Sequence, residues 1–283
     1  MTTLYILLFA IGLLPFLLGF GLLRPVAPDS RSGWRPLASS TLLCALAFNL
    51  TFFWQEIWLV VPKALTPGLD PVLYHNDHNW TGGDPLAELL QGTGAIGTLL
   101  SGLAFLALLA GVRRVSVTWR LFFFWMAFQG LFQSLSQLAI GTLLPGNDMG
   151  RALVWFGLSQ SAKTALLALA VALMAAAGAA LARFWPAVSQ RTRRFGWHML
   201  GATMVSILLV IPFRVPREPI EVVLIPLAVN LIGLGWLVLG AALTRPSRGS
   251  RATLAAATLG GPTIALALTL LFFQLVLRPG IAF

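Results

Sequence analysis

Long apolar runs alternate with short polar or arginine-bearing segments along the whole chain. A helix needs about 20 mostly apolar residues to cross a bilayer. Eight runs reach or approach that length, at residues 3–23, 37–62, 93–112, 120–145, 155–184, 196–213, 220–243 and 253–277. The first run lacks a basic leading segment and a small-residue cleavage site, so it indicates a true span and not a secretory signal. The sequence predicts an all-α integral membrane protein, a polytopic bundle of about eight transmembrane helices that forms one domain over residues 1–283.

Composition supports this interpretation. The chain is 58% hydrophobic and only 10% charged, whereas a soluble domain averages about 25% charged residues. The net charge of +10 does not indicate nucleic-acid binding, because the basic residues lie at helix ends and not on one face. Cys44 is the single cysteine, which excludes an internal disulfide and a cysteine-based zinc cage. The Ala-, Leu-, Gly- and Arg-rich composition favours a bacterial source, and therefore the inner membrane.

The basic residues also predict the orientation in the membrane. Most of the 19 Lys and Arg residues fall in alternate connections between the predicted spans, at Arg24, Arg31, Arg35, Arg113, Arg114, Arg120, Arg183, Arg191, Arg193, Arg194, Arg245, Arg248 and Arg251. Connections rich in Lys and Arg stay in the cytoplasm. Both termini are therefore expected to be extracytoplasmic, as is the longest connection, residues 63–92.

That connection contains the run "YHNDHNWTGGD", which starts at Tyr74. His75, Asp77 and His78 offer two imidazoles and a carboxylate, a set that suits zinc or another divalent metal. The zinc-protease motif, with two histidines around a glutamate at helical spacing, is absent. Two other interpretations stay open: a solvated turn anchored at the headgroups by Trp80, and a segment that contacts protons or substrate.

Two of the predicted spans carry strongly polar side chains. Glu56 lies near the outer end of the second span, where it either pairs with a base at the interface or binds a ligand or proton. Gln129, Gln133 and Gln137 recur every four residues in the fourth span and so form one stripe. Such a stripe either hydrogen-bonds to neighbouring helices or lines a hydrated cavity that opens outward.

The connection after the fourth span and the start of the fifth span add further candidates. Asp148 and Arg151 have the spacing of a local ion pair, and Asp148 could act as a general base. Gln160 and Lys163 follow near the expected outer interface. Lys163 either extends its amine to the interface or points inward as a counter-ion for Glu56 or Asp148.

The third span opens with glycines at Gly92, Gly94 and Gly97, which match the dinucleotide-binding spacing. That motif requires a preceding strand and a soluble βαβ unit, so we reject a nucleotide site. Gly94, Thr98 and Gly102 lie one helical turn apart, and small residues at this spacing let helix backbones approach closely. The pattern predicts a tightly packed helix.

Three function classes agree with these features. The first is a membrane-embedded hydrolase or transferase that acts at the outer face on a lipid-linked substrate. Glu56, Asp148 and Lys163 would be catalytic, the metal ligands His75, Asp77 and His78 would hold zinc, and Gln129, Gln133, Gln137, Gln160 and Arg151 would bind substrate. The second is a small-solute or ion transporter or channel, and the third is a non-catalytic subunit of a larger complex. Membrane lipids are expected partners in each case, together with a membrane-protein partner or a second copy of the chain.

Overall fold

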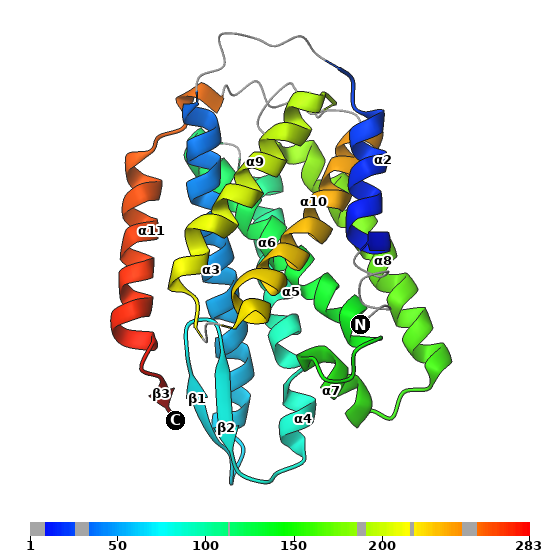
Figure 1. The fold of residues 1–283 in the computed structure, drawn as a ribbon, viewed down its shortest axis with the longest axis vertical. Helices are drawn as coiled ribbons and strands as arrows, with labels where there is room; N and C mark the ends of the chain where they lie inside the picture. Colours follow the sequence, from blue (N-terminus) through cyan, green and yellow to red (C-terminus); the bar gives the residue numbers. More distant parts are fainter. Residues whose placement is uncertain (1–8, 26–33, 113, 186–190, 216–217, 245–253) are drawn as a thin grey trace.

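A computed structural model describes residues 9–25, 34–112, 114–185, 191–215, 218–244 and 254–283 (Figure 1). Helices occupy all eight predicted ranges: η1 Phe9–Leu13 with α2 Leu14–Leu22, α3 Arg35–Ala64, α5 Thr93–Gly111, α6 Val117–Gly141, α8 Gln160–Phe184, α9 Arg193–Val210, α10 Ile225–Leu243 and α11 Gly260–Phe272. Short helical turns extend three of them: η2 Ile211–Phe213 after α9, η3 Ile220–Leu224 before α10, and η5 Phe273–Leu277 after α11. A separate turn, η4 Leu254–Ala256, precedes α11.

Six of the described helical segments are long and apolar enough to cross a membrane: Arg35–Ala64, Leu86–Gly111, Gln160–Phe184, Arg193–Phe213, Val222–Leu243 and Gly260–Leu277. The protein is therefore an all-α membrane bundle, as predicted. The glutamine-bearing helix α6 is not among the six, and Ala10–Leu22 is a shorter apolar helix. The number of eight crossings and the orientation of the termini stay predictions.

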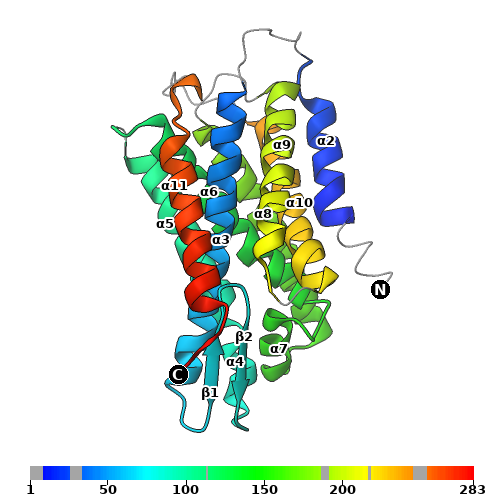
Figure 2. The same ribbon diagram turned by 60° about the vertical axis from the view of Figure 1, so that its left-hand side comes forward.

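The helices run between two distinct ends of the molecule. The β1–β2 hairpin, α4 and α7 lie together at one end, which we call the hairpin end (Figures 1 and 2). At the opposite end, which we call the arginine end, α3 and α6 begin. Arg24, Arg35, Arg114 and Arg191 belong to the segments there, and Arg24 pairs its backbone with Arg191. These arginine-bearing segments, which alternate with other connections along the sequence, therefore lie together at one end of the molecule.

Helices α3 and α6 form the centre of the bundle. Helix α6 packs against α5, α8, α3 and α10, and its aromatic side chains Phe124, Trp125 and Phe132 are fully buried. Lipid tails are as apolar as leucine, so burial from water does not drive helices together inside a membrane. Close packing and interhelical hydrogen bonds stabilise the bundle instead, and both are concentrated along α3 and α6.

Glycines allow the closest helix crossings. A Cβ added at Gly102 of α5 would meet the backbone nitrogen of Leu131 on α6 at 2.5 Å. A Cβ at Gly94 would meet the side chains of Gln55 and Leu59 on α3 at 2.8 Å. The prediction that small residues make this a tightly packed helix is confirmed, and one helix uses different glycines against two neighbours.

The predicted loop 63–92 contains regular structure that the all-α interpretation did not anticipate. Strand β1, Asp70–Leu73, pairs antiparallel with β2, His78–Thr81, and with β3, Ile281–Ala282, near the carboxyl terminus. The short helix α4, Leu86–Leu90, follows, and α7, Asp148–Trp155, packs on it. The hydrogen bond from the Tyr74 backbone nitrogen to the Asp77 oxygen closes the hairpin turn at 3.0 Å. Strands this short leave little periodic pattern in a sequence.

Candidate functional site

His78 is the centre of a buried polar cluster at the hairpin end. Its Nδ1 lies 2.8 Å from Oε2 of Glu56, and its Nε2 lies 3.0 Å from Oε1 of Gln91. Glu56 and His78 are both buried, with exposed fractions of 3% and 9%. Both acceptors are oxygens, so in this arrangement each ring nitrogen donates and the imidazole carries a positive charge. Of the two interpretations of Glu56, the structure shows the pairing with a base, and the base is a histidine from the hairpin.

The secondary structure explains how these three side chains meet. Glu56 lies on the last turns of α3, His78 is the first residue of β2, and Gln91 follows α4. The hairpin folds back over the end of α3, which brings a residue 22 positions later in the chain onto Glu56. Pro62 does not end α3, which continues to Ala64. The continuation places Lys63 beside the same cluster.

Lys63 is fully buried, which is unusual for a lysine. Its Nζ donates to the backbone oxygen of Leu59 at 3.0 Å and approaches Oε1 of Gln91 at 3.4 Å. It also lies 4.8 Å from the centre of the Trp80 ring, within the range of a cation–π interaction. The Trp80 ring in turn stacks on His78, with 5.8 Å between ring centroids. Trp80 therefore forms part of the cluster, whereas the sequence indicated only a headgroup anchor.

Arg151 approaches the same tryptophan. Its guanidinium carbon lies 5.1 Å from the centre of the Trp80 ring. Its Nε and Nη2 donate to the two carboxylate oxygens of Glu88 at 2.6 and 2.7 Å, a bidentate pair that raises the pKa of Arg151. The predicted ion pair of Arg151 with Asp148 is wrong, because the carboxylate that pairs with Arg151 belongs to α4. This pair joins α7 to α4 at the rim of the cluster.

Asp148, the first residue of α7, completes the charged set. Burial raises the pKa of Asp148, while the charges of His78 and Lys63 oppose that rise. Its carboxylate has no hydrogen-bond partner among the described residues, whereas the Glu56 carboxylate is engaged by His78. Burial alone would lower the pKa of His78, but the hydrogen bond to Glu56 and its charge raise it above the ordinary value. The pKa values of both groups are therefore raised, for different reasons.

The two histidines of the hairpin point to different parts of the bundle. His75 Nε2 lies 2.9 Å from the backbone oxygen of Phe213, and its ring packs on Phe273. The Asn76 side chain bonds the backbone of Val215 in both directions, at 2.7 and 3.3 Å. Burial lowers the pKa of His75 to about 4, so this ring is neutral at physiological pH. This half of the turn fastens the hairpin to the ends of α9 and α11.

The predicted zinc ligands are consequently engaged elsewhere. Asp77 Oδ1 accepts a hydrogen bond from the His78 backbone nitrogen at 2.8 Å, and burial raises the pKa of its carboxyl. Across the part of the chain that the structure describes, no three His, Cys, Asp or Glu side chains form a group that could hold a metal ion. The zinc site of His75, Asp77 and His78 stays a prediction that this arrangement does not favour.

The glutamine stripe of α6 forms hydrogen bonds between helices, which confirms that interpretation. Gln133 and Gln137 both donate to Oε1 of Gln55 on α3, at 2.6 and 2.5 Å. One turn deeper, Gln129 donates to Oδ1 of Asn230 on α10 at 3.0 Å. The side-chain oxygens of the three stripe glutamines are buried and have no hydrogen-bond partner among the described residues. Unpaired acceptors are costly in a bilayer core, so these oxygens could accept bonds from water or a bound solute.

Smaller polar groups continue this series towards the arginine end. The Ser206 hydroxyl of α9 lies 3.3 Å from the Cys44 sulfur. Trp125 Nε1 donates to the Ser40 hydroxyl at 3.0 Å. From Glu56 to Ser40, α3 covers about 24 Å at 1.5 Å per residue. Buried polar contacts therefore recur over most of a hydrocarbon thickness, which is about 30 Å.

Two predicted site residues lie apart from the cluster. Lys163 lies in the first turn of α8, and among the described residues its amine pairs with neither Glu56 nor Asp148. Gln160 is the first residue of the same helix and is exposed. Neither residue contributes to the cluster as the structure describes it.

Two members of the site had no sequence signal. Gln91 and Gln55 are single glutamines without a periodic partner in their own segments, and only the fold brings them to His78 and to the stripe. Comparison of the chain with protein-family models, with curated proteins and with solved structures found no match in any of the three.

Proposed function

We propose that this protein is a membrane-embedded hydrolase or transferase that works by acid–base catalysis at its hairpin end. The observation that supports the proposal is the buried imidazole of His78, held between the Glu56 carboxylate and the Gln91 amide. A carboxylate on Nδ1 fixes the orientation of the ring and stabilises the charged imidazole, as in other acid–base pairs. The second nitrogen can then transfer a proton to a reacting group.

The roles follow from the contacts of the two groups. Charged His78 is the general acid, and its Nε2 gives a proton to the leaving oxygen. Asp148, raised in pKa by burial and without a hydrogen-bond partner among the described residues, is the general base. It takes a proton from water in a hydrolase, or from an alcohol in a transferase. The attacking oxygen forms the new bond as the ester bond breaks, and return of the proton from Asp148 to His78 closes the cycle.

The cations near the cluster favour an anionic substrate. Lys63 and Arg151 both lie within about 6 Å of the Trp80 ring, the usual limit for a cation–π contact. Substrate would replace Gln91 at His78 Nε2 and bring its negative charge to Lys63. Because the site lies at the end of a membrane bundle, we propose a lipid-linked phosphate ester as the substrate. The proposed acid–base mechanism uses no metal, so the predicted zinc ion takes no part in it.

Lipid analysis of membranes tests the proposal. Purified protein would be incubated with vesicles made from the total lipid extract of its host, and released phosphorus compounds followed by ³¹P NMR. We expect release by the wild type and a loss on the order of 10²–10⁴-fold in His78→Gln and Asp148→Asn, the usual range for general acid–base groups. Asp70→Asn, which removes an exposed carboxylate from the same hairpin, is the control. Equal release by all four proteins, or release by none of them, would refute the proposed enzymatic activity.

Transport is the second candidate, and the series of buried polar contacts along α3 and α6 favours it. The amide oxygens of Gln129 and Gln133, for which the described part of the chain supplies no partner, resemble the acceptors that solvate ions or water in membrane pathways. Uptake into proteoliposomes that requires Gln133 but not Asp148 would favour this alternative. The third class, a subunit of a larger complex, would be favoured by a membrane-protein partner that co-purifies through the hairpin end.

The membrane arrangement is part of the proposal. We infer eight crossings with both termini and the hairpin outside, in the inner membrane of a bacterium. The support comes from the positive-inside rule and from Arg24, Arg35, Arg114 and Arg191, which lie at the opposite end from the hairpin. The zinc site can be tested separately by metal analysis of purified wild type and of the His75→Ala/His78→Ala variant.

A further inference from the structure

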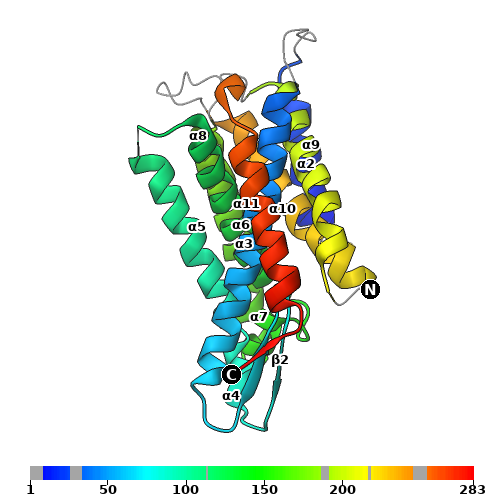
Figure 3. The same ribbon diagram turned by 90° about the vertical axis from the view of Figure 1, so that its left-hand side faces the viewer.

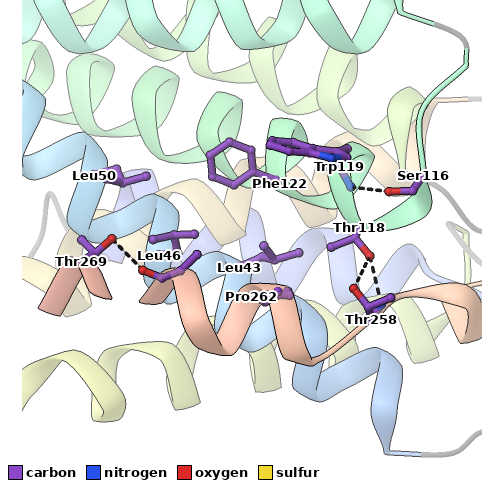
Figure 4. A pocket seen from close by; sticks show the side chains of 12 residues that line it. Leu43, Leu46, Leu50, Ser116, Thr118, Trp119, Phe122, Thr258, Pro262 and Thr269 are labelled. Carbon is purple, nitrogen blue, oxygen red and sulfur yellow. Dashed lines mark hydrogen bonds between the residues drawn. The ribbon is translucent and has the colours of Figure 1, made fainter. Parts of the chain in front are cut away.

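A groove lies between α3, α6 and α11, away from the polar cluster (Figure 4). Its apolar walls are Leu43, Leu46 and Leu50 of α3, Phe122 of α6, and Pro262 and Ala265 of α11. Its volume is about 450 Å³. Helix α11 packs mainly on α3 and lies at the edge of the bundle (Figures 1 and 3). We call this space the α11 groove.

One end of the α11 groove is polar. Ser116, Thr118 and Thr258 lie there, and the hydroxyls of the two threonines are 3.2 Å apart. Trp119, which is 56% exposed, lies beside them. Aromatic residues of this kind mark the level of the lipid headgroups. The groove thus runs from an interfacial rim into the apolar part of the bundle.

We propose that the α11 groove binds one acyl chain of an anionic phospholipid, with the headgroup at the rim. Arg114 is exposed just before α6 at this end, and Arg35 is exposed at the start of α3. The described acidic side chains that form contacts, Glu56, Asp77, Asp84 and Glu88, belong to the hairpin end. Positive charge beside an apolar groove complements a lipid phosphate.

The shape and lining of the groove suit part of an acyl chain. Its walls from Leu43 to Leu50 extend about 10 Å along α3 at 1.5 Å per residue. Beyond the polar rim the lining is mostly apolar, and none of the described lining residues is charged. The proposal does not depend on the acid–base site, because Leu50 lies about 9 Å from Glu56 along α3, towards the arginine end.

A photo-crosslinking experiment tests the proposal. The full-length protein would be reconstituted in phosphatidylcholine vesicles that contain a trace of phosphatidylglycerol with a diazirine in its acyl chain. We expect label in the peptides that contain residues 116–122 and 258–269. Ala265→Trp, which fills the groove, should lower that label by on the order of tenfold, or ~1.4 kcal/mol. Leu208→Trp, on a lipid-exposed position of α9, is the matched control.

A second variant separates chain binding from headgroup binding. Arg114→Gln should lower the preference for phosphatidylglycerol over an equally labelled phosphatidylcholine, while groove labelling by phosphatidylcholine persists. If Ala265→Trp leaves the labelling unchanged, the groove is not the binding site. If both lipids label the wild type equally, the site does not select an anionic headgroup. Cross-links to a second copy or another protein through these peptides would show a protein occupant instead.

Discussion

Replacement of Glu56 by alanine isolates the central contact of the site. Glu56 and His78 are buried, and their closest nitrogen and oxygen are 2.8 Å apart. Removal of one partner leaves a charged imidazole without its counter-ion, at a cost of about 3–5 kcal/mol for a buried pair. Glu56→Gln keeps an oxygen that accepts the hydrogen bond and loses only the charge, so we expect about 1–3 kcal/mol. Because of this geometry, Glu56→Ala should destabilise the protein more than Glu56→Gln does.

Thermal unfolding in detergent, followed by far-ultraviolet circular dichroism, measures these changes. At about 2–4 °C for each kcal/mol, Glu56→Ala should lower the midpoint by about 6–20 °C. Asp70→Ala removes an exposed carboxylate from the hairpin and should change stability by about 0.5 kcal/mol or less. A double-mutant cycle of Glu56→Gln with His78→Gln should give a coupling of about 1 kcal/mol or more. If the unfolding midpoint of Glu56→Ala is no lower than that of Asp70→Ala, Glu56 and His78 do not form a buried ion pair.

Three further predictions concern pH, packing and orientation. The folded-state pKa of His78 is raised, so its contribution to stability is complete below its ordinary value of 6.5 and is lost as pH rises through the folded-state value. His75 has a folded-state pKa of about 4, so its contribution to stability is present above pH 6.5 and is lost as pH falls through 4. In a plot of the unfolding midpoint against pH, His78→Gln should therefore flatten the alkaline limb. His75→Gln should flatten the acid limb. Gly102→Val should lower the unfolding midpoint because its side chain would meet the α6 backbone, whereas Gly111→Val, where an added Cβ meets no atom of the described residues within 4 Å, should not. A cysteine at exposed Thr81 should react with a membrane-impermeant thiol reagent in intact cells, and reaction only after lysis would reverse the proposed orientation.

The sequence by itself determined the class of fold and the position of the helices. Apolar runs of membrane length need no tertiary information, because the bilayer imposes their length and satisfies no backbone group. The four-residue spacing of Gly94, Thr98 and Gly102, and of the α6 glutamines, was also readable, because helical periodicity decides which residues share a face. The glycine pattern predicted close packing correctly, and the glutamine stripe had interhelical hydrogen bonds as one of its two interpretations, but neither pattern indicated which helix would supply the partner.

Only the tertiary structure decided the composition of the site. His75 and His78 are three residues apart, yet the turn between β1 and β2 sends one to α9 and the other to α3. Arg151 has a carboxylate three residues before it and pairs instead with Glu88, 63 residues away. Sequence spacing fixes which side chains share a face only inside a regular element. In the connections, pairing depends on where the elements bring the chain, and that is set by the packing of the whole bundle.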